Sequence, residues 1–118
     1  PSAQHALINH FGYIEETACD TKINYDDEGW FEMLAEHLDR GWPLIYRAYA
    51  ENDGPGHAWN VDWYQEGGYL HCNWGWGGYD NGYFLLSTLG GFTDSQSALI
   101  NIEPWLKPKR VTLLLSVL

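Results

Sequence analysis

The chain has 118 residues, of which 16 are acidic and six are lysine or arginine, so its formal net charge is −10. This length allows one small domain or part of a larger one. The excess of carboxylates repels phosphate groups, and we therefore expect no binding to nucleic acid or to an anionic membrane.

Two helices are predicted in the first third of the chain. Residues 3–11 carry apolar side chains at spacings that suit a short helix, which Gly12 ends. Residues 13–21 are acidic and irregular, and residues 22–25 suit a short extended piece. Asp26 or Asp27 is expected to cap a second helix that ends at Gly41. Its apolar stripe consists of Trp30, Phe31, Leu34, His37 and Leu38.

About five strands are predicted after the second helix. They are expected over residues 43–49, 57–64, 69–74, 83–86 and 97–102, with turns rich in Gly, Asn and Asp between them. Because helices and strands are segregated, the predicted class is α+β: two N-terminal helices followed by an antiparallel β-sheet of about five strands. We assign residues 1–104 to this unit. Residues 105–118, which contain a basic linker and the apolar run VTLLLSVL, are expected to form a tail or an extra edge strand.

Residues 56–78, GHAWNVDWYQEGGYLHCNWGWGG, are predicted to form a hairpin that turns at Glu66-Gly67. Pairing its strands about this turn matches Trp63 with Leu70, Val61 with Cys72, Trp59 with Trp74, and His57 with Trp76. The other face then pairs Asp62 with His71 and Asn60 with Asn73. The outcome is one imidazole at the end of a face lined by indoles.

His57 is a candidate general base on chemical grounds. It follows Gly54-Pro55-Gly56 at the start of a strand, where Gly56 would let a substrate backbone come close. The alternative is a structural histidine, which is the commoner role for a single histidine on a strand. The abundant aromatic residues, including seven Trp and eight Tyr, leave a similar choice between a groove for peptide or sugar and a sheet packed with large rings.

The two cysteines, Cys19 and Cys72, are too few for a disulfide framework. Cys72 is predicted to point inward as a small apolar residue, and Cys19 lies in a polar connector. A disulfide between the two is left open by the sequence. Because no histidine spacing accompanies the cysteines, no metal site is expected, and no cofactor is predicted.

Residues 3–104 resemble the streptopain family of bacterial cysteine peptidases, which have a papain-like fold. The resemblance lies in GHAWNVDWY, LHCNWGWGGYDNGYF and SALINIEP, and extends back through RGWPLIYRAYA and ALINHFGY. It implies that residues 1–104 form the sheet-rich, C-terminal, His-bearing lobe, with His57 as the general base. It also implies that Asn73 and Trp74 lie against this ring, fixing and shielding it, and that Gly56, Trp76 and Gly77 bind substrate.

The family's nucleophile lies in a glycine-cysteine motif that opens a helix before the segment matching ALINHFGY. We therefore expect the nucleophile to precede this chain, because neither Cys19 nor Cys72 has that context. The expected partners are a Cys-bearing N-terminal half and a peptide or protein substrate. The chain alone is predicted to be inactive, and a secreted location is implied by the resemblance although the chain shows no signal peptide.

Two alternatives remain at this point. The first is a non-catalytic or degenerate lobe whose aromatic groove binds a peptide without cleaving it. The second is a structural fragment with neither activity, which would expose a large apolar face.

Overall fold

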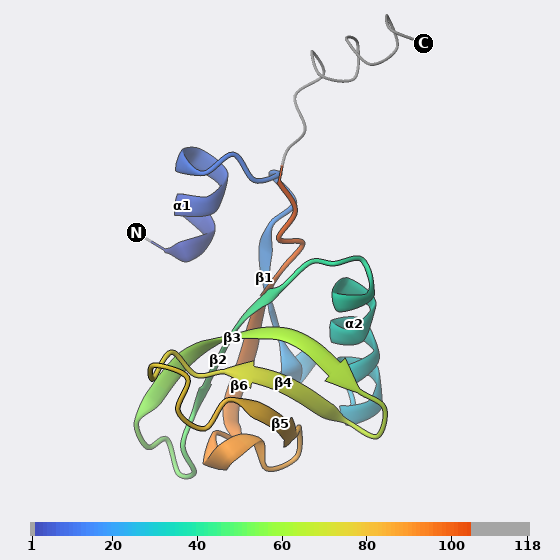
Figure 1. Cartoon of the computed structure of the whole chain (residues 1–118), viewed down its shortest axis with the longest axis vertical. Helices are drawn as coiled ribbons and strands as arrows, with labels where there is room; N and C mark the ends of the chain where they lie inside the picture. The colour runs from blue at the N-terminus through green and yellow to red at the C-terminus, as the bar shows by residue number, and fades with distance from the viewer. Residues whose placement is uncertain (1, 105–118) are drawn as a thin grey trace, which may run out of the picture.

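The structure, a computed structural model, describes residues 2–104, and within them six strands form one antiparallel sheet (Figure 1). Two α-helices and two 3₁₀ turns accompany the sheet. In chain order the elements are α1 (Ala3–His10), β1 (Ala18–Thr21), η1 (Lys22–Asn24), α2 (Asp27–Asp39), β2 (Leu44–Tyr49), β3 (Gly56–Gln65), β4 (Tyr69–Asn73), β5 (Gly82–Leu85), η2 (Leu89–Gly91) and β6 (Asp94–Ile100). The strand order across the sheet is β1-β6-β2-β3-β4-β5. The fold is therefore α+β, as the sequence predicted.

The sequence did not predict β1, and the two helices do not both precede the strands. β1 lies between α1 and α2 in the chain and pairs with β6, so that Cys19 is opposite Leu99. A partner 80 residues away leaves no local signal in a short polar segment. The predicted extended piece over residues 22–25 is also wrong, because residues 22–24 form a 3₁₀ turn. The proposed tail or edge strand at 105–118 lies outside the described residues.

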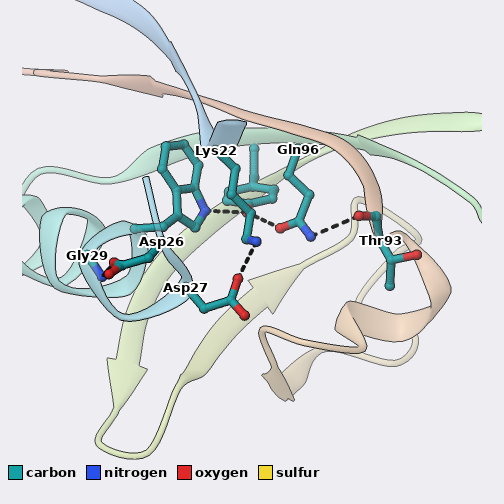
Figure 2. A network of polar contacts seen from close by, with 8 residues as sticks. Lys22, Asp26, Asp27, Gly29, Thr93 and Gln96 are labelled. Carbon is teal, nitrogen blue, oxygen red and sulfur yellow. Dashed lines mark hydrogen bonds and ion pairs between the residues drawn. The ribbon is translucent and has the colours of Figure 1, made fainter. Parts of the chain in front are cut away.

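Helix α2 covers one face of the sheet and supplies much of the core (Figure 1). Its start is set by Asp26, whose side chain accepts a hydrogen bond from the Gly29 amide at 2.7 Å (Figure 2). Trp30, Leu34 and Leu38 on its inner face are at most 2% exposed. They pack against the inward side chains of the sheet, which include Leu44, Tyr46, Val61, Leu70 and Cys72. Burial of each large apolar side chain contributes about 1.5–3 kcal/mol.

A chain of hydrogen bonds crosses this core from α2 to β6 (Figure 2). The Trp30 indole donates to the Tyr46 hydroxyl at 2.8 Å, and Tyr46 donates to the side-chain oxygen of Gln96. The Gln96 amide donates in turn to the Thr93 carbonyl at 3.1 Å. Burial raises the pKa of Tyr46, so the hydroxyl stays a donor. The network fixes β2 between α2 and β6, and β2 in turn positions β3.

Helix α1 stands apart from α2 and the sheet face that α2 covers (Figure 1). Ser2 caps it by accepting from the His5 amide at 3.2 Å, but none of its residues is buried. Phe11, just after its end, is 70% exposed. A β-bridge between Tyr13 and Pro104 connects this region to the segment after β6. Among the residues described, no helix is long and apolar enough to cross a membrane.

The β3–β4 hairpin follows the predicted register at two pairs only. The predicted strand pairs Trp59–Trp74 and His57–Trp76 do not form, because β4 ends at Asn73, and Trp74 and Trp76 both lie in the loop after it. Asn60 is opposite Asn73 and Val61 is opposite Cys72, as expected. Beyond them a bulge at Asp62 adds one residue to β3, so Trp63 pairs with His71 and not with Leu70. The turn consequently spans residues 66–68, between the pair Gln65 and Tyr69. Asp62 still meets His71 across the bulge, with Oδ1 and Nδ1 2.6 Å apart.

Candidate active site

His57 lies at the start of β3 and is enclosed by aromatic rings from three parts of the chain. Its half-buried imidazole stacks on Trp76 at 5.1 Å between ring centroids, on Trp59 at 5.9 Å and on Trp74 at 6.3 Å. Phe92, between η2 and β6, adds a fourth ring at 5.7 Å. The predicted placement of one imidazole beside the indoles is therefore confirmed. These rings form apolar walls around the flanks of the imidazole.

One hydrogen bond determines how the imidazole carries its proton. His57 Nε2 lies 2.9 Å from the carbonyl oxygen of Trp74. A carbonyl can only accept, so Nε2 must carry the hydrogen. In the neutral ring Nδ1 is then left with a lone pair, which makes it the nitrogen able to accept a proton.

Trp74 is held firmly in the position that this bond requires. Its side chain is 2% exposed, and its indole N–H donates to the Asp80 carbonyl at 3.0 Å. The ring packs edge-on against Phe84, with the centroids 5.1 Å apart. On another side it touches Gly90, where an added Cβ would lie only 3.1 Å from two indole carbons. Trp74 thus acts on His57 through both its ring and its main-chain carbonyl.

Asn73 occupies a different place from the one that the resemblance implied. Its side chain is exposed, and its Oδ1 accepts a hydrogen bond from the Gly75 amide at 3.1 Å. The group that hydrogen-bonds the His57 ring is the Trp74 carbonyl. The hairpin register had already directed Asn73 to the opposite face from Trp74.

Of the three residues expected to bind substrate, Trp76 and Gly77 have open surroundings and Gly56 does not. Trp76 is 46% exposed although it stacks on His57. Gly77 has a φ of +65°, and nothing lies within 4 Å of the Cβ position. Gly56 is opposite Tyr49 in the sheet, and a Cβ there would lie 2.7 Å from Tyr49 Cε1. The ring of Tyr49 therefore covers the space above this glycine.

Sequence reasoning missed Phe92 and Tyr49 as members of this region. Phe92 reaches His57 from a loop 35 positions along the chain, and Tyr49 reaches Gly56 from the neighbouring strand. Neither residue belongs to a recognisable motif. Residues 43–49 were predicted as a strand, but its pairing with the hairpin, which brings Tyr49 to Gly56, is seen only in the structure.

Neither cysteine of the chain is placed to react with His57, and both are free within the described residues. Cys72 is fully buried, and this burial raises the pKa of its thiol to about 12. Cys19 is exposed on β1, at the far edge of the sheet. The register aligns it across the sheet in the row Cys19, Leu99, Ile45 and Asn60. Cys19 and His57 are therefore three strand spacings apart across the sheet and three residues apart along β3. Together these displacements amount to roughly 17 Å.

A cavity of about 620 Å³ lies between the first turns of α2, the β3–β4 turn, the end of β5 and the start of β6. Its lining includes Phe31, Glu66 and Leu85 but none of the site residues predicted from the sequence. The turn that borders it is about 26 Å along β3 from His57. The candidate active site is therefore the region around His57, and this cavity is not part of it.

Comparison with known proteins gives matches over most of the chain. Residues 1–84 match the model of the family described as Peptidase C10 family. Streptopain from Streptococcus pyogenes is 30% identical over 112 residues, which cover 86% of this chain and 28% of streptopain. The thiol protease/hemagglutinin PrtT from Porphyromonas gingivalis is 38% identical over 113 residues, covering 86% of this chain and 13% of PrtT.

Solved structures agree with these matches. The active wild-type interpain A cysteine protease from Prevotella intermedia aligns with a TM-score of 0.65 and 32% identity. The alignment covers 75% of this chain and 39% of interpain A. The chain spans a smaller share, less than a third, of the length of the streptopain and PrtT sequences that it matches.

Proposed function

This chain belongs to the peptidase C10 family, and we propose that it supplies the general base of a cysteine peptidase, His57, together with one wall of the substrate groove. In this proposal residues 1–104 are the His-bearing lobe of a secreted bacterial endopeptidase. Its substrates are peptides or proteins.

The observation that carries the proposal is the hydrogen bond from His57 Nε2 to the Trp74 carbonyl. With Nε2 protonated, Nδ1 is the unprotonated nitrogen of a half-buried ring that is flanked by indoles. A thiol loses most of its reactivity when it is protonated, and near neutral pH a free thiol is mostly protonated. An imidazole with an available lone pair next to it removes this obstacle.

The proposed reaction uses His57 Nδ1 as a proton carrier. Nδ1 takes the thiol proton as the sulfur attacks the peptide carbonyl carbon, and a tetrahedral intermediate forms. When the C–N bond breaks, the imidazolium returns this proton to the departing amine, leaving a thioester. Nδ1 then takes a proton from water as the water oxygen attacks the thioester. Breaking the C–S bond releases the carboxylic acid product, and the proton held by the imidazolium returns to the sulfur.

We further propose that the thiol comes from a segment outside these 118 residues. The burial of Cys72 and the position of Cys19 at the far edge of the sheet support this source. The small share of streptopain that the chain covers supports it as well. The partner is then the Cys-bearing half of the same enzyme.

Hydrolysis of a fluorogenic peptide by the longer protein that contains this chain tests the proposal. His57→Gln should lower kcat/KM by about 10²–10⁴-fold. His71→Gln is the matched control: His71 pairs with Asp62 and is not among the rings that surround His57, so this variant should retain activity. The double variant Cys19→Ser/Cys72→Ser should also retain activity, provided that it is folded. The 118-residue chain alone should give no turnover, and turnover by this chain carrying both serines would refute the proposal.

A second function, peptide binding without cleavage, is favoured by the exposure of Trp76. Its indole is 46% exposed beside His57, as a wall for an extended peptide would be. Titration of the longer protein with peptides, followed by tryptophan fluorescence, separates the two functions. Saturable quenching with no product from any peptide would assign the binding function.

A further inference from the structure

Two asparagine side chains hold the peptide groups on either side of Trp74. The backbone N–H of Trp74 donates to Asn81 Oδ1 at 3.1 Å. The next N–H, that of Gly75, donates to Asn73 Oδ1 at 3.1 Å. Trp74 is therefore fixed at both of its peptide groups by side chains.

The second of these peptide groups carries the carbonyl that meets His57. A peptide unit is planar, so the Trp74 C=O and the Gly75 N–H belong to one rigid plate. Asn73 holds the N–H end of this plate, and the His57 Nε2–H binds its C=O end. Gly75 has a φ of +80°, which a glycine adopts readily and which orients the plate.

The other peptide group joins Asn73 to Trp74. Asn81 restrains its rotation by accepting a hydrogen bond from its N–H. The loop between the two residues is closed by hydrogen bonds from the Tyr79 amide to the Trp76 carbonyl at 3.2 Å and from the Trp74 indole to the Asp80 carbonyl at 3.0 Å. The loop thus returns to Trp74 and brings the Asn81 side chain to its amide. Both donors of Trp74, the amide and the indole N–H, are satisfied by neighbouring residues of this one loop.

We propose that Asn81 is a positioning residue for His57, acting through Trp74. By fixing the peptide group before Trp74, it keeps the carbonyl where His57 Nε2–H binds, and so keeps Nδ1 as the unprotonated nitrogen. The catalytic consequence rests on the proposed function, but the effect on the imidazole does not. Asn81 lies within the segment LHCNWGWGGYDNGYF, but no sequence pattern assigned it a role.

The state of the His57 ring in the 118-residue chain tests this role directly. The ¹⁵N chemical shifts of Nδ1 and Nε2, measured where the ring is neutral, report which nitrogen carries the hydrogen. Asn81→Ala removes the acceptor and should lower the ratio of the Nε2–H to the Nδ1–H form by about fivefold, the factor that corresponds to one hydrogen bond of about 1 kcal/mol. Asn81→Asp keeps an acceptor oxygen and should leave the ratio near its original value.

Two further variants make the result decisive. Asn9→Ala, in α1, is the matched control and should leave the ratio unchanged. Asn81→Ser shortens the side chain while keeping turn-forming chemistry, and it should behave as Asn81→Ala does. An unchanged ratio in a folded Asn81→Ala or Asn81→Ser variant would overturn the proposal. Unfolding of both, with Asn81→Asp folded, would also overturn it by assigning Asn81 a structural role.

Peptidase kinetics test the catalytic consequence separately from the state of the imidazole. In the longer protein, Asn81→Ala should lower kcat more than it raises KM, and Asn81→Asp should restore kcat. A longer protein without any peptidase activity would refute the proposed function. The ¹⁵N ratio would still decide whether Asn81 positions His57.

Discussion

Replacing Gly56 by alanine should destabilise the chain through one neighbour, Tyr49. The added Cβ would lie 2.7 Å from Tyr49 Cε1 and 2.9 Å from Cδ1, closer than carbon atoms approach without displacement. Tyr49 is the direct cross-strand partner of Gly56, and its ring covers the glycine as aromatic side chains do in sheets. The ring must therefore move when residue 56 gains a side chain.

The magnitude follows from two opposing terms. Overpacking of this kind costs about 1–3 kcal/mol, and the low end applies because Tyr49 is 36% exposed and can swing outward. Against this, alanine restricts the unfolded chain and returns about 0.4–1 kcal/mol, since Gly56 does not have a positive φ. With about 1–2 kcal/mol for the clash and a return of about 0.4–1 kcal/mol, the net loss should be about 0–1.5 kcal/mol. In a Tyr49→Ala background the clash is gone, and Gly56→Ala should be neutral or slightly stabilising.

Urea unfolding followed by tryptophan fluorescence measures all four members of this double-mutant cycle. The expected coupling between the two sites is about 1–2 kcal/mol, well above the roughly 0.3–0.5 kcal/mol seen for independent sites. A coupling near zero would refute the steric reasoning. The same variants in the longer protein test the substrate role implied for Gly56. If the glycine leaves room for a substrate backbone, kcat/KM stays low in Gly56→Ala even when Tyr49 is alanine.

Four other predictions concern thiol reactivity, the dependence of stability on alkaline and on acid pH, and the loop after Trp74. In the folded chain iodoacetamide should modify Cys19 and spare Cys72, and mass spectrometry that finds both modified at equal rates would contradict the burial argument. Burial raises the pKa of Cys72 to about 12, and an unfolded thiol titrates near ~8.5; stability should thus be fully present below that value and fall as the pH rises toward 12, a dependence that Cys72→Ala should remove. Burial alone would raise the pKa of Asp20, but hydrogen bonds from the Tyr25 hydroxyl and a backbone amide outweigh it and lower the pKa. Asp20 therefore stabilises the fold above about pH 4 and loses this effect as the pH falls through its lowered pKa, so Tyr25→Phe should reduce the dependence of stability on pH in acid. Gly77→Ala should cost about 1–2 kcal/mol in unfolding experiments because φ is +65°, and Gly77→Asn should cost less.

The local elements of the fold were predictable because their signals lie within a few residues of one another. The Asp26 cap and the apolar stripe of α2 give that helix, and the alternation of Leu44, Tyr46 and Ala48 gives the buried face of β2. Pairs made of distant segments were not predictable in the same way. β1 is a strand only because β6 is beside it, and the bulge at Asp62 shifts the register beyond Val61 without any signal from glycine or proline.

The same distinction between local and distant signals applies to the candidate site. The sequence by itself predicted correctly that one imidazole, that of His57, lies among indoles, because the tryptophans are close to it along one short hairpin segment. The predicted strand pairing was not the cause, since Trp74 and Trp76 reach the ring from the loop after β4. Only the tertiary structure decided that the Trp74 carbonyl accepts a hydrogen bond from His57 Nε2–H, that Asn73 binds the Gly75 amide and that Phe92 joins the aromatic walls. The reason is physical: periodicity fixes the side of a strand on which a residue lies, whereas hydrogen bonds depend on the orientation of single peptide groups, which is set by how the loop after Trp74 closes.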